Sequence, residues 1–149
     1  MYEYDRLILI QSITIDNMKL RGCFKLSISK IPQSELNVMK VIWESNKPIS
    51  SKDVIGESQE KFGWKRTTTL TLLSKLVQKE FLSSEKIKLY SYYTALISKK
   101  EYLEFETKYF FTNIHENSLK SLITALHENN EITNEDLEDL EQWIKNREE

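Results

Sequence analysis

The sequence predicts a mainly α-helical protein that carries one small β-hairpin. Only 3 Gly and 2 Pro occur among 149 residues, too few for the frequent turns of an all-β sandwich. From Pro32 onward, apolar residues recur at spacings of three and four over most of the chain, which is typical of amphipathic helices. One stretch, near residues 81–93, alternates instead and is rich in Tyr, which indicates paired strands.

The first two helices are predicted from their end signals. Pro32 suits the entry of a helix over about Gln33 to Ser45, which the run Asn46-Lys47-Pro48 ends. Ser50 as N-cap with Asp53 three residues on then resembles a capping box, and the second helix continues to about Lys61. Gly63 allows the tight turn that follows.

A third helix is predicted from about Lys65 to about Glu80. One face is largely apolar and should point inward; it comprises Trp64, Thr68, Thr69, Leu72, Leu73 and Leu76. The opposite face begins with two cations and continues with short hydroxyl side chains; it comprises Lys65, Arg66, Thr67, Leu70, Thr71, Ser74 and Lys75. Two strands over 81–93, with a turn near Glu85-Lys86, would complete the domain. Three helices followed by a hairpin form a winged helix-turn-helix, here assigned to residues 28–97.

Residues 98–149 are predicted to form a helical dimerisation region. Ser98 with Glu101 and Thr133 with Asp136 are capping signals, and Asn129-Asn130 separates the last two helices. Three apolar stripes within 52 residues are more than a compact monomer of that size buries, so self-association is expected. The predicted dimer interface comprises Tyr102, Phe105, Tyr109, Phe110, Leu119, Leu122, Ile123, Leu126, Leu140 and Trp143.

Residues 1–27 form an N-terminal extension of uncertain order. Leu7–Ile10 and Ile13–Ile15 could form a short strand or hairpin, and an unstructured tail is an equal alternative. Met18 is an alternative start of the chain.

Charge is distributed unevenly along the chain. Residues 28–97 carry 11 Lys or Arg and 7 Asp or Glu, whereas residues 98–149 carry 6 and 13. A basic middle joined to an acidic end is expected when only the middle part contacts phosphate. A partner that binds the basic part in a salt-dependent way is therefore expected, but charge alone does not name it; the resemblance described below implies double-stranded DNA.

Several functional classes are excluded or disfavoured. The chain has no G-x-G-x-x-G or P-loop motif, no 18-residue apolar run and one cysteine, Cys23, so neither nucleotide-binding signature, nor a membrane span, nor a disulfide framework is expected. The residues that could support catalysis are Cys23, His115 and His127, and the two histidines lack metal-ligand spacing. We therefore predict a soluble cytoplasmic protein that is not an enzyme and needs neither cofactor nor metal. A winged helix used only for protein–protein contact remains the alternative.

Three runs carry a resemblance to a known family. They are Pro32-x-Ser34-Glu35-Leu36-x-Val38-Met39-x-x-Ile42-Trp43, then Trp64-Lys65-Arg66-Thr67-Thr68-Thr69-x-Thr71-Leu72-Leu73-x-Lys75-Leu76-x-x-Lys79, then Tyr90. In order and spacing they resemble the BlaI/MecI/CopY penicillinase-repressor family, over roughly Ser29 to Lys145. The resemblance implies an N-terminal winged helix, a C-terminal dimerisation region, and a homodimeric transcriptional repressor on a pseudo-palindromic operator.

The sequence departs from the family at three places. Penicillinase repressors are cut by a sensor-linked protease at an Asn-Phe pair after a cell-wall antibiotic signal, and the corresponding candidate cleavage pair here is Ala125-Leu126. The copper-responsive branch carries a C-terminal Cys-x-Cys, which this chain lacks. Leu70 stands where the penicillinase repressors have an Arg, so a different operator sequence is expected.

The predicted DNA contacts lie on the third helix, the second helix and the hairpin. The third helix should enter the major groove with its first turn nearest the bases. Its predicted contact residues are Lys65, Arg66, Thr67, Leu70, Thr71 and Lys75. Ser50 begins a helix whose free N–H groups could hold a phosphate, and Lys86 and Lys88 should contact the neighbouring backbone. Lys79 is expected to be merely solvated, and Trp43 and Trp64 to belong to the core.

Overall fold

The computed structural model describes residues 28–147. The predictions made for residues 1–27, including the short strands, Met18 and Cys23, lie outside the described residues. Six helices and three strands follow in the order α2 (Gln33–Ser45), β1 (Ile49–Ser50), α3 (Ser51–Phe62), α4 (Arg66–Gln78), β2 (Leu82–Ile87), β3 (Tyr90–Ala95), α5 (Lys99–Asn113), α6 (Leu119–Glu128) and α7 (Asn134–Lys145). The predicted class, mainly helical with a small hairpin, is confirmed.

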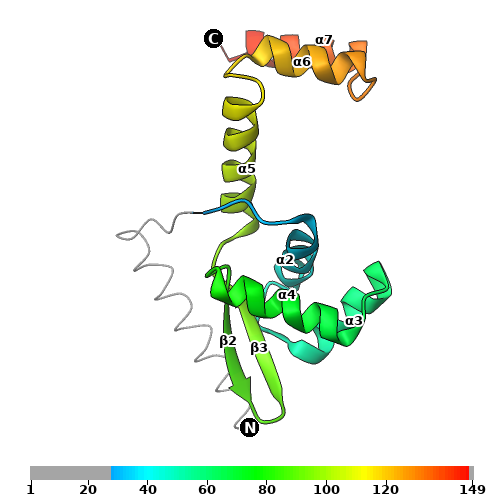
Figure 1. The fold of residues 1–149 in the computed structure, drawn as a ribbon. Coiled ribbons are helices and arrows are strands. Elements are labelled where there is room, and N and C mark those ends of the chain that lie inside the picture. The colour runs from blue at the N-terminus through cyan, green and yellow to red at the C-terminus, as the bar shows by residue number, and fades with distance from the viewer. Residues whose placement is uncertain (1–27, 148–149) are drawn as a thin grey trace. The chain divides into compact units, whose positions relative to one another are not determined.

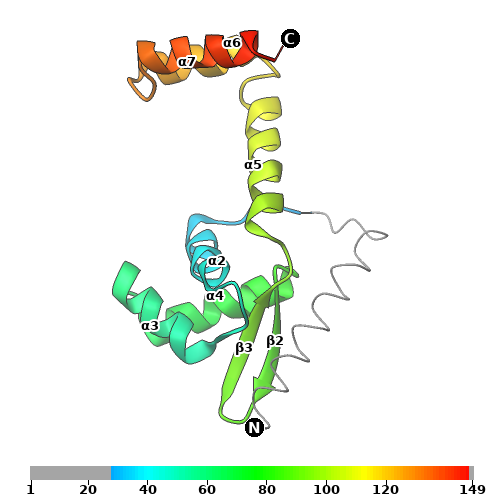
Figure 2. The same cartoon turned by 180° about the vertical axis from the view of Figure 1, so that it is seen from behind.

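The first unit, which ends at Leu103, is a winged helix. Helices α2, α3 and α4 contact one another, and α4 leads directly into the β2–β3 hairpin, which extends beyond the helices in both views (Figure 1 and Figure 2). The strands pair antiparallel in the order β1-β3-β2. The two-residue strand β1, where Ile49 lies opposite Tyr93, had no detectable sequence signal.

The core of the first unit is apolar and joins all three helices to the sheet. Its fully buried side chains include Val38, Met39, Val54, Leu73, Leu76, Phe81 and Leu82. Trp43 lies at the edge of this core, where its Nε1 donates a hydrogen bond to the carbonyl oxygen of Ile97 at 2.9 Å. Trp64 is half-buried against Phe62, with 4.7 Å between the ring centroids. Both indoles are half-buried.

Local sequence signals explain most helix ends. The Ser50 hydroxyl caps α3 by accepting a hydrogen bond from the Asp53 N–H at 3.2 Å, and Gly63 ends this helix at φ +67°. Ser98 and Glu101 bond reciprocally at the start of α5, and Thr133 with Asp136 forms a complete capping box at α7. The predicted caps at Ser98 and Thr133 are confirmed, and at Ser50 only the hydroxyl half of the predicted capping box is present.

The hairpin turn lies later than predicted. Glu85 and Lys86 are paired residues of β2, and the loop is Lys88-Leu89 between the paired residues Ile87 and Tyr90. The loop has no Gly, so composition gave no clear turn position, and the strand pairing sets the register instead. Helix α4 is also shorter than predicted, and Thr68, expected on the inner face, is exposed.

The second unit, Glu104–Glu149, contains most of α5 with α6 and α7. Within the described part of α6 and α7, no residue is fully buried. Tyr102, predicted at the dimer interface, belongs instead to the first unit, where it is only 3% exposed. Its hydroxyl accepts a hydrogen bond from the Ile31 N–H at 3.2 Å, and its ring lies 5.8 Å from that of Phe81. The interface prediction for Tyr102 is therefore wrong, and the first unit extends beyond the predicted boundary at residue 97.

Candidate nucleic-acid interface

The N-terminus of α4 is left open to solvent. Lys65 is the N-cap, and its carbonyl accepts from the N–H groups of Thr68 and Thr69, but within residues 28–147 no side chain caps this end. The N–H groups of Arg66 and Thr67 precede the first possible intrahelical acceptor. No acidic residue occurs in the first turn, so no negative charge there neutralises the positive end of the helix dipole. Lys65 and Arg66 add two further positive charges at this end.

The outer face of α4 matches the predicted contact set closely. Lys65, Arg66, Thr67, Thr71 and Lys75 are exposed, together with Ser74, whereas Leu70 is half-buried. The opposite face, formed by Thr69, Leu72, Leu73 and Leu76, is buried in the core. The helix therefore presents cations and hydroxyls from a rigid, packed support, and we call this outer surface the α4 face.

Thr71 has a defined hydrogen-bonding role on this face. Its Oγ1 donates to the carbonyl oxygen of Thr67 at 2.9 Å, so the hydroxyl proton is engaged within the helix. What remains outward is an acceptor lone pair and a methyl group. Such a group suits an amino donor on a base edge or a thymine methyl.

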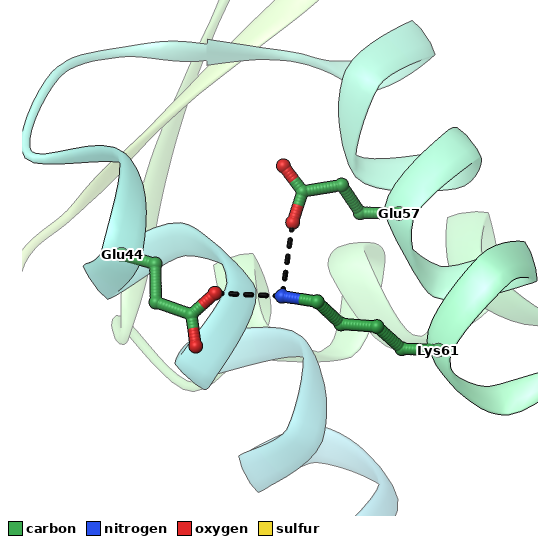
Figure 3. A network of polar contacts seen from close by, with 3 residues as sticks. All are labelled: Glu44, Glu57 and Lys61. Carbon is green, nitrogen blue, oxygen red and sulfur yellow. Dashed lines mark hydrogen bonds and ion pairs between the residues drawn. The ribbon is translucent and has the colours of Figure 1, made fainter.

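Two other cations of the first unit are paired with carboxylates, unlike those of the α4 face. Lys61 lies 2.6 Å from Glu44 on α2 and 3.2 Å from Glu57 on its own helix (Figure 3). This contact lowers the pKa of Glu44, chiefly through the hydrogen bond from Lys61, and raises the pKa of Lys61.

Lys79 is also paired, contrary to the prediction of a merely solvated side chain. Its Nζ lies 2.6 Å from the carboxylate of Glu35, whose side chain is only 3% exposed. The partner is 44 positions away in sequence, so local spacing could not reveal it. In the described part of the chain, no ion pair involves Lys65, Arg66, Lys75 or Lys86.

The remaining predicted contacts are placed less uniformly. Ser50 is only 7% exposed, and its hydroxyl donates to the Asp53 carboxylate at 2.6 Å. That carboxylate already neutralises the start of α3, so the prediction that Ser50 contacts phosphate receives no support from the geometry. Lys86 is exposed on β2, and Lys88 lies at the hairpin tip with φ +53°.

Comparison with known proteins identifies the family. The family model described as penicillinase repressor matches residues 31–146. The chain belongs to the penicillinase repressor family. It is 31% identical to the penicillinase repressor of Bacillus licheniformis over 121 residues, which is 79% of this chain and 94% of that protein. It is 27% identical to the methicillin resistance regulatory protein MecI of Staphylococcus aureus over 112 residues, 74% of this chain and 89% of that protein.

A solved structure is also similar to part of the chain. The solution structure of the Bacillus licheniformis BlaI monomeric form in complex with the blaP half-operator shares 34% identity, covering 51% of this chain and 92% of that chain, with a TM-score of 0.45. Family membership makes this chain a transcriptional repressor. The comparisons support this function and not the alternative of a protein-interaction module.

The second unit of this penicillinase repressor family member leaves large apolar side chains uncovered. Of the predicted interface residues, Tyr109, Phe110, Leu119 and Trp143 are 43–55% exposed, whereas Phe105, Leu122, Ile123, Leu126 and Leu140 are half-buried. The prediction omitted two more exposed apolar residues of this unit, Ile114 and Ile144, and also Leu103, the last residue of the first unit. All three lie within the same apolar helical pattern and could have been included on that signal.

The two histidines and the candidate cleavage pair of the second unit make ordinary structural contacts. His115 is 9% exposed and its Nδ1 lies 3.0 Å from the Ser121 hydroxyl, while a ring nitrogen of His127 lies 3.1 Å from Asn134. Ala125 and Leu126, the candidate cleavage pair, lie inside α6 and are half-buried.

Residues 28–147 contain no group of three His, Cys, Asp or Glu side chains that could hold a metal ion. None of the described helices combines the length and apolar character needed to cross a membrane.

Proposed function

We propose that this repressor binds a pseudo-palindromic DNA operator as a homodimer, with α4 of each protomer in the major groove. One observation carries the proposal: the α4 face combines unpaired cations, hydroxyls and an uncapped positive helix end on one exposed surface. By contrast, Lys61 and Lys79 of the same unit are neutralised by carboxylates.

Each residue of the α4 face has a chemical role in this proposal. Lys65 and Arg66 reach guanine O6 and N7 or a phosphate, and Thr67 contacts a base edge. Thr71 offers its lone pair and methyl group, and half-buried Leu70 offers only apolar contact to a thymine methyl. Lys75, farther along the helix, and Lys86 and Lys88 on the hairpin contact phosphates, which adds affinity without sequence information.

Dimerisation supplies the second recognition helix. One such helix buries too little surface to distinguish an operator from competing genomic sites. Two helices about 34 Å apart read successive major grooves, and a two-fold dimer provides this spacing. The uncovered apolar side chains of the second unit, including Phe110 and Trp143, are the surface that we assign to this dimer. Losing it releases DNA, because the second half-site then no longer benefits from a high effective concentration.

Derepression by a sensor-linked protease fits this scheme under one condition. Ala125 and Leu126 lie within a helix, and a helical peptide bond is not in the extended form that proteases bind. A cut between them therefore requires α6 to unfold locally. Local unfolding costs little free energy in a helix that has few buried side chains. We propose cleavage of the bond between Ala125 and Leu126 after such local unfolding. Because this pair departs from Asn-Phe, the inducing signal is left unassigned.

Catalysis plays no part in the proposal. His115 and His127 make single polar contacts inside the second unit, and neither is combined with a nucleophile or a metal-ligand set in the described residues. The chain acts by occupying DNA in the cytoplasm, with no cofactor.

The test is selection of bound sequences from random duplex DNA with the full chain. We expect the wild type to enrich a two-fold symmetric sequence. Arg66→Ala and Thr71→Ala should weaken binding to it by about tenfold or more, the usual range for a lost base contact, while the dimer stays intact in sedimentation. The control, Lys120→Ala, removes a cation from an exposed position of α6 and should bind as the wild type does. Unchanged footprints from both α4 variants would place recognition elsewhere.

A further inference from the structure

The tip of the β2–β3 hairpin carries an apolar side chain that the chain itself leaves uncovered. Leu89 is 86% exposed, the highest value among the exposed large hydrophobic residues of the described chain. It occupies the two-residue loop with Lys88. A single exposed apolar residue is ordinary on a protein surface, so its position and surroundings decide whether it has a role.

The loop sequence is a poor choice for the turn it makes. Two-residue hairpin loops favour Gly, Asn and Asp, because positive φ angles are needed. Here Lys88 adopts φ +53°, a conformation uncommon for a residue of its type. Glu80 and Glu116 also have positive φ, so this conformation alone does not mark a binding site. A contact at the tip is indicated instead by Leu89 and its surroundings.

The surroundings of Leu89 are cationic and aromatic. Lys86 and Lys88 are exposed beside it, and Tyr90 is 42% exposed. An apolar tip flanked by cations fits a surface that offers phosphates on both sides and apolar edges between them. The minor groove of duplex DNA is such a surface, and proteins insert Leu side chains there as wedges between base steps.

The length of the hairpin fits this position. Strands β2 and β3 have six residues each, which span about 20 Å at about 3.3 Å per residue. One helical turn of DNA is about 34 Å, so the minor groove lies about 17 Å along the axis from a major groove that holds a helix. The hairpin leaves the body of the winged helix at the end of α4 and extends beyond the helices (Figure 1).

We propose that Leu89 enters the minor groove beside the half-site bound by α4 and partly unstacks one base step there. This rests on the proposed function and deepens it: Leu89 becomes a specificity-determining residue that makes no hydrogen bond. Its preference is for DNA that unstacks readily, namely pyrimidine–purine steps, over stiff A-tracts.

The experiment uses the full chain and the symmetric duplex that it selects from random DNA. A 2-aminopurine is placed at the step half a turn outside each α4 half-site, and its fluorescence reports unstacking. Leu89→Asn removes the apolar side chain and supplies a residue that favours turns, so the hairpin is retained. Leu89→Met keeps an apolar side chain of similar size and serves as the matched control.

We expect wild type and Leu89→Met to raise the fluorescence and to prefer a pyrimidine–purine step at this position by about tenfold over an A-tract. Leu89→Asn should lose both effects while its affinity for unselected duplex changes less than about twofold. If Leu89→Asn retains the step preference and the fluorescence change, the inference is overturned even though α4 recognition stands. If the wild type selects no sequence, the proposed function has failed instead.

Discussion

The salt dependence of DNA binding is the most direct quantitative consequence of the α4 face. Four of the proposed contact residues are exposed cations without an ion-pair partner in the described chain, namely Lys65, Arg66, Lys75 and Lys86. Lys88 is left out of this count because it has another interaction within the chain. A dimer that places all of them on phosphates releases about eight counterions. The logarithm of the binding constant then falls by about 0.9 per contact for each unit of log salt concentration, giving a slope near −7. Between about 50 and 200 mM salt, affinity should fall by about 10⁴-fold.

A charge-matched pair of variants tests this count. Lys65→Gln with Arg66→Gln removes four contacts per dimer, so the slope should drop to about −4 and the loss over the same salt range to about 10²-fold. The control, Lys120→Gln with Lys145→Gln, changes net charge equally at exposed positions of the second unit and should leave the slope near −7. Fluorescence anisotropy with a labelled random-sequence duplex measures all three proteins. A wild-type slope weaker than about −3, or an equal slope in the α4 double variant, would refute the assignment of these cations to phosphate.

Three further predictions concern the dimer, the first unit and pH. Phe110→Asp should give monomers with weak operator affinity, and sedimentation showing an unchanged dimer would place the interface elsewhere. Tyr102→Phe should lower the free energy of unfolding by about 1–3 kcal/mol, because the buried Ile31 N–H loses its acceptor; denaturant titration measures this, and the dimer should persist. The pKa of Asp136 is lowered by hydrogen bonds from the backbone and hydroxyl of Thr133, so the stability it gives is present above the unfolded pKa and is lost as pH falls through the lower folded value. Helix content followed by circular dichroism should therefore decline as the pH falls below about 3.8, the ordinary value for Asp. The decline should be less steep in Thr133→Val, and identical pH profiles would contradict this role for the capping box.

Features with local causes were predictable from the sequence. The bounds of α2, the Ser50 and Ser98 caps, and the end of α3 at Gly63 depend on a few neighbouring residues. The α4 face was predictable for the same reason, since helical spacing alone separates Arg66 and Thr71 from the buried side. Each of these predictions needed information from no more than about one or two helical turns.

Features with distant causes were not predictable. The Glu35–Lys79 ion pair and the hydrogen bond from Ile31 to Tyr102 each join residues far apart in sequence. Tyr102 shares its helix with apolar residues that stay exposed, so periodicity could not show that this residue alone returns to the first unit's core. The hairpin register was missed because Lys88 adopts a conformation that turn statistics reserve for other residues.

The presence or absence of a carboxylate partner says more about the role of an individual cation than the total charge of the first unit does. Residues 28–97 contain 11 cations, yet Lys61 and Lys79 are spent on contacts that hold α2 against α3 and α4. The cations of the α4 face have no such partner in the described chain, so their charge remains available to DNA. The proposed dimer doubles that charge on one duplex, so a monomeric variant should bind with about half the wild-type salt slope as well as lower affinity. The salt slope therefore measures dimerisation through the second unit, although the cations that determine the slope all lie in the first unit.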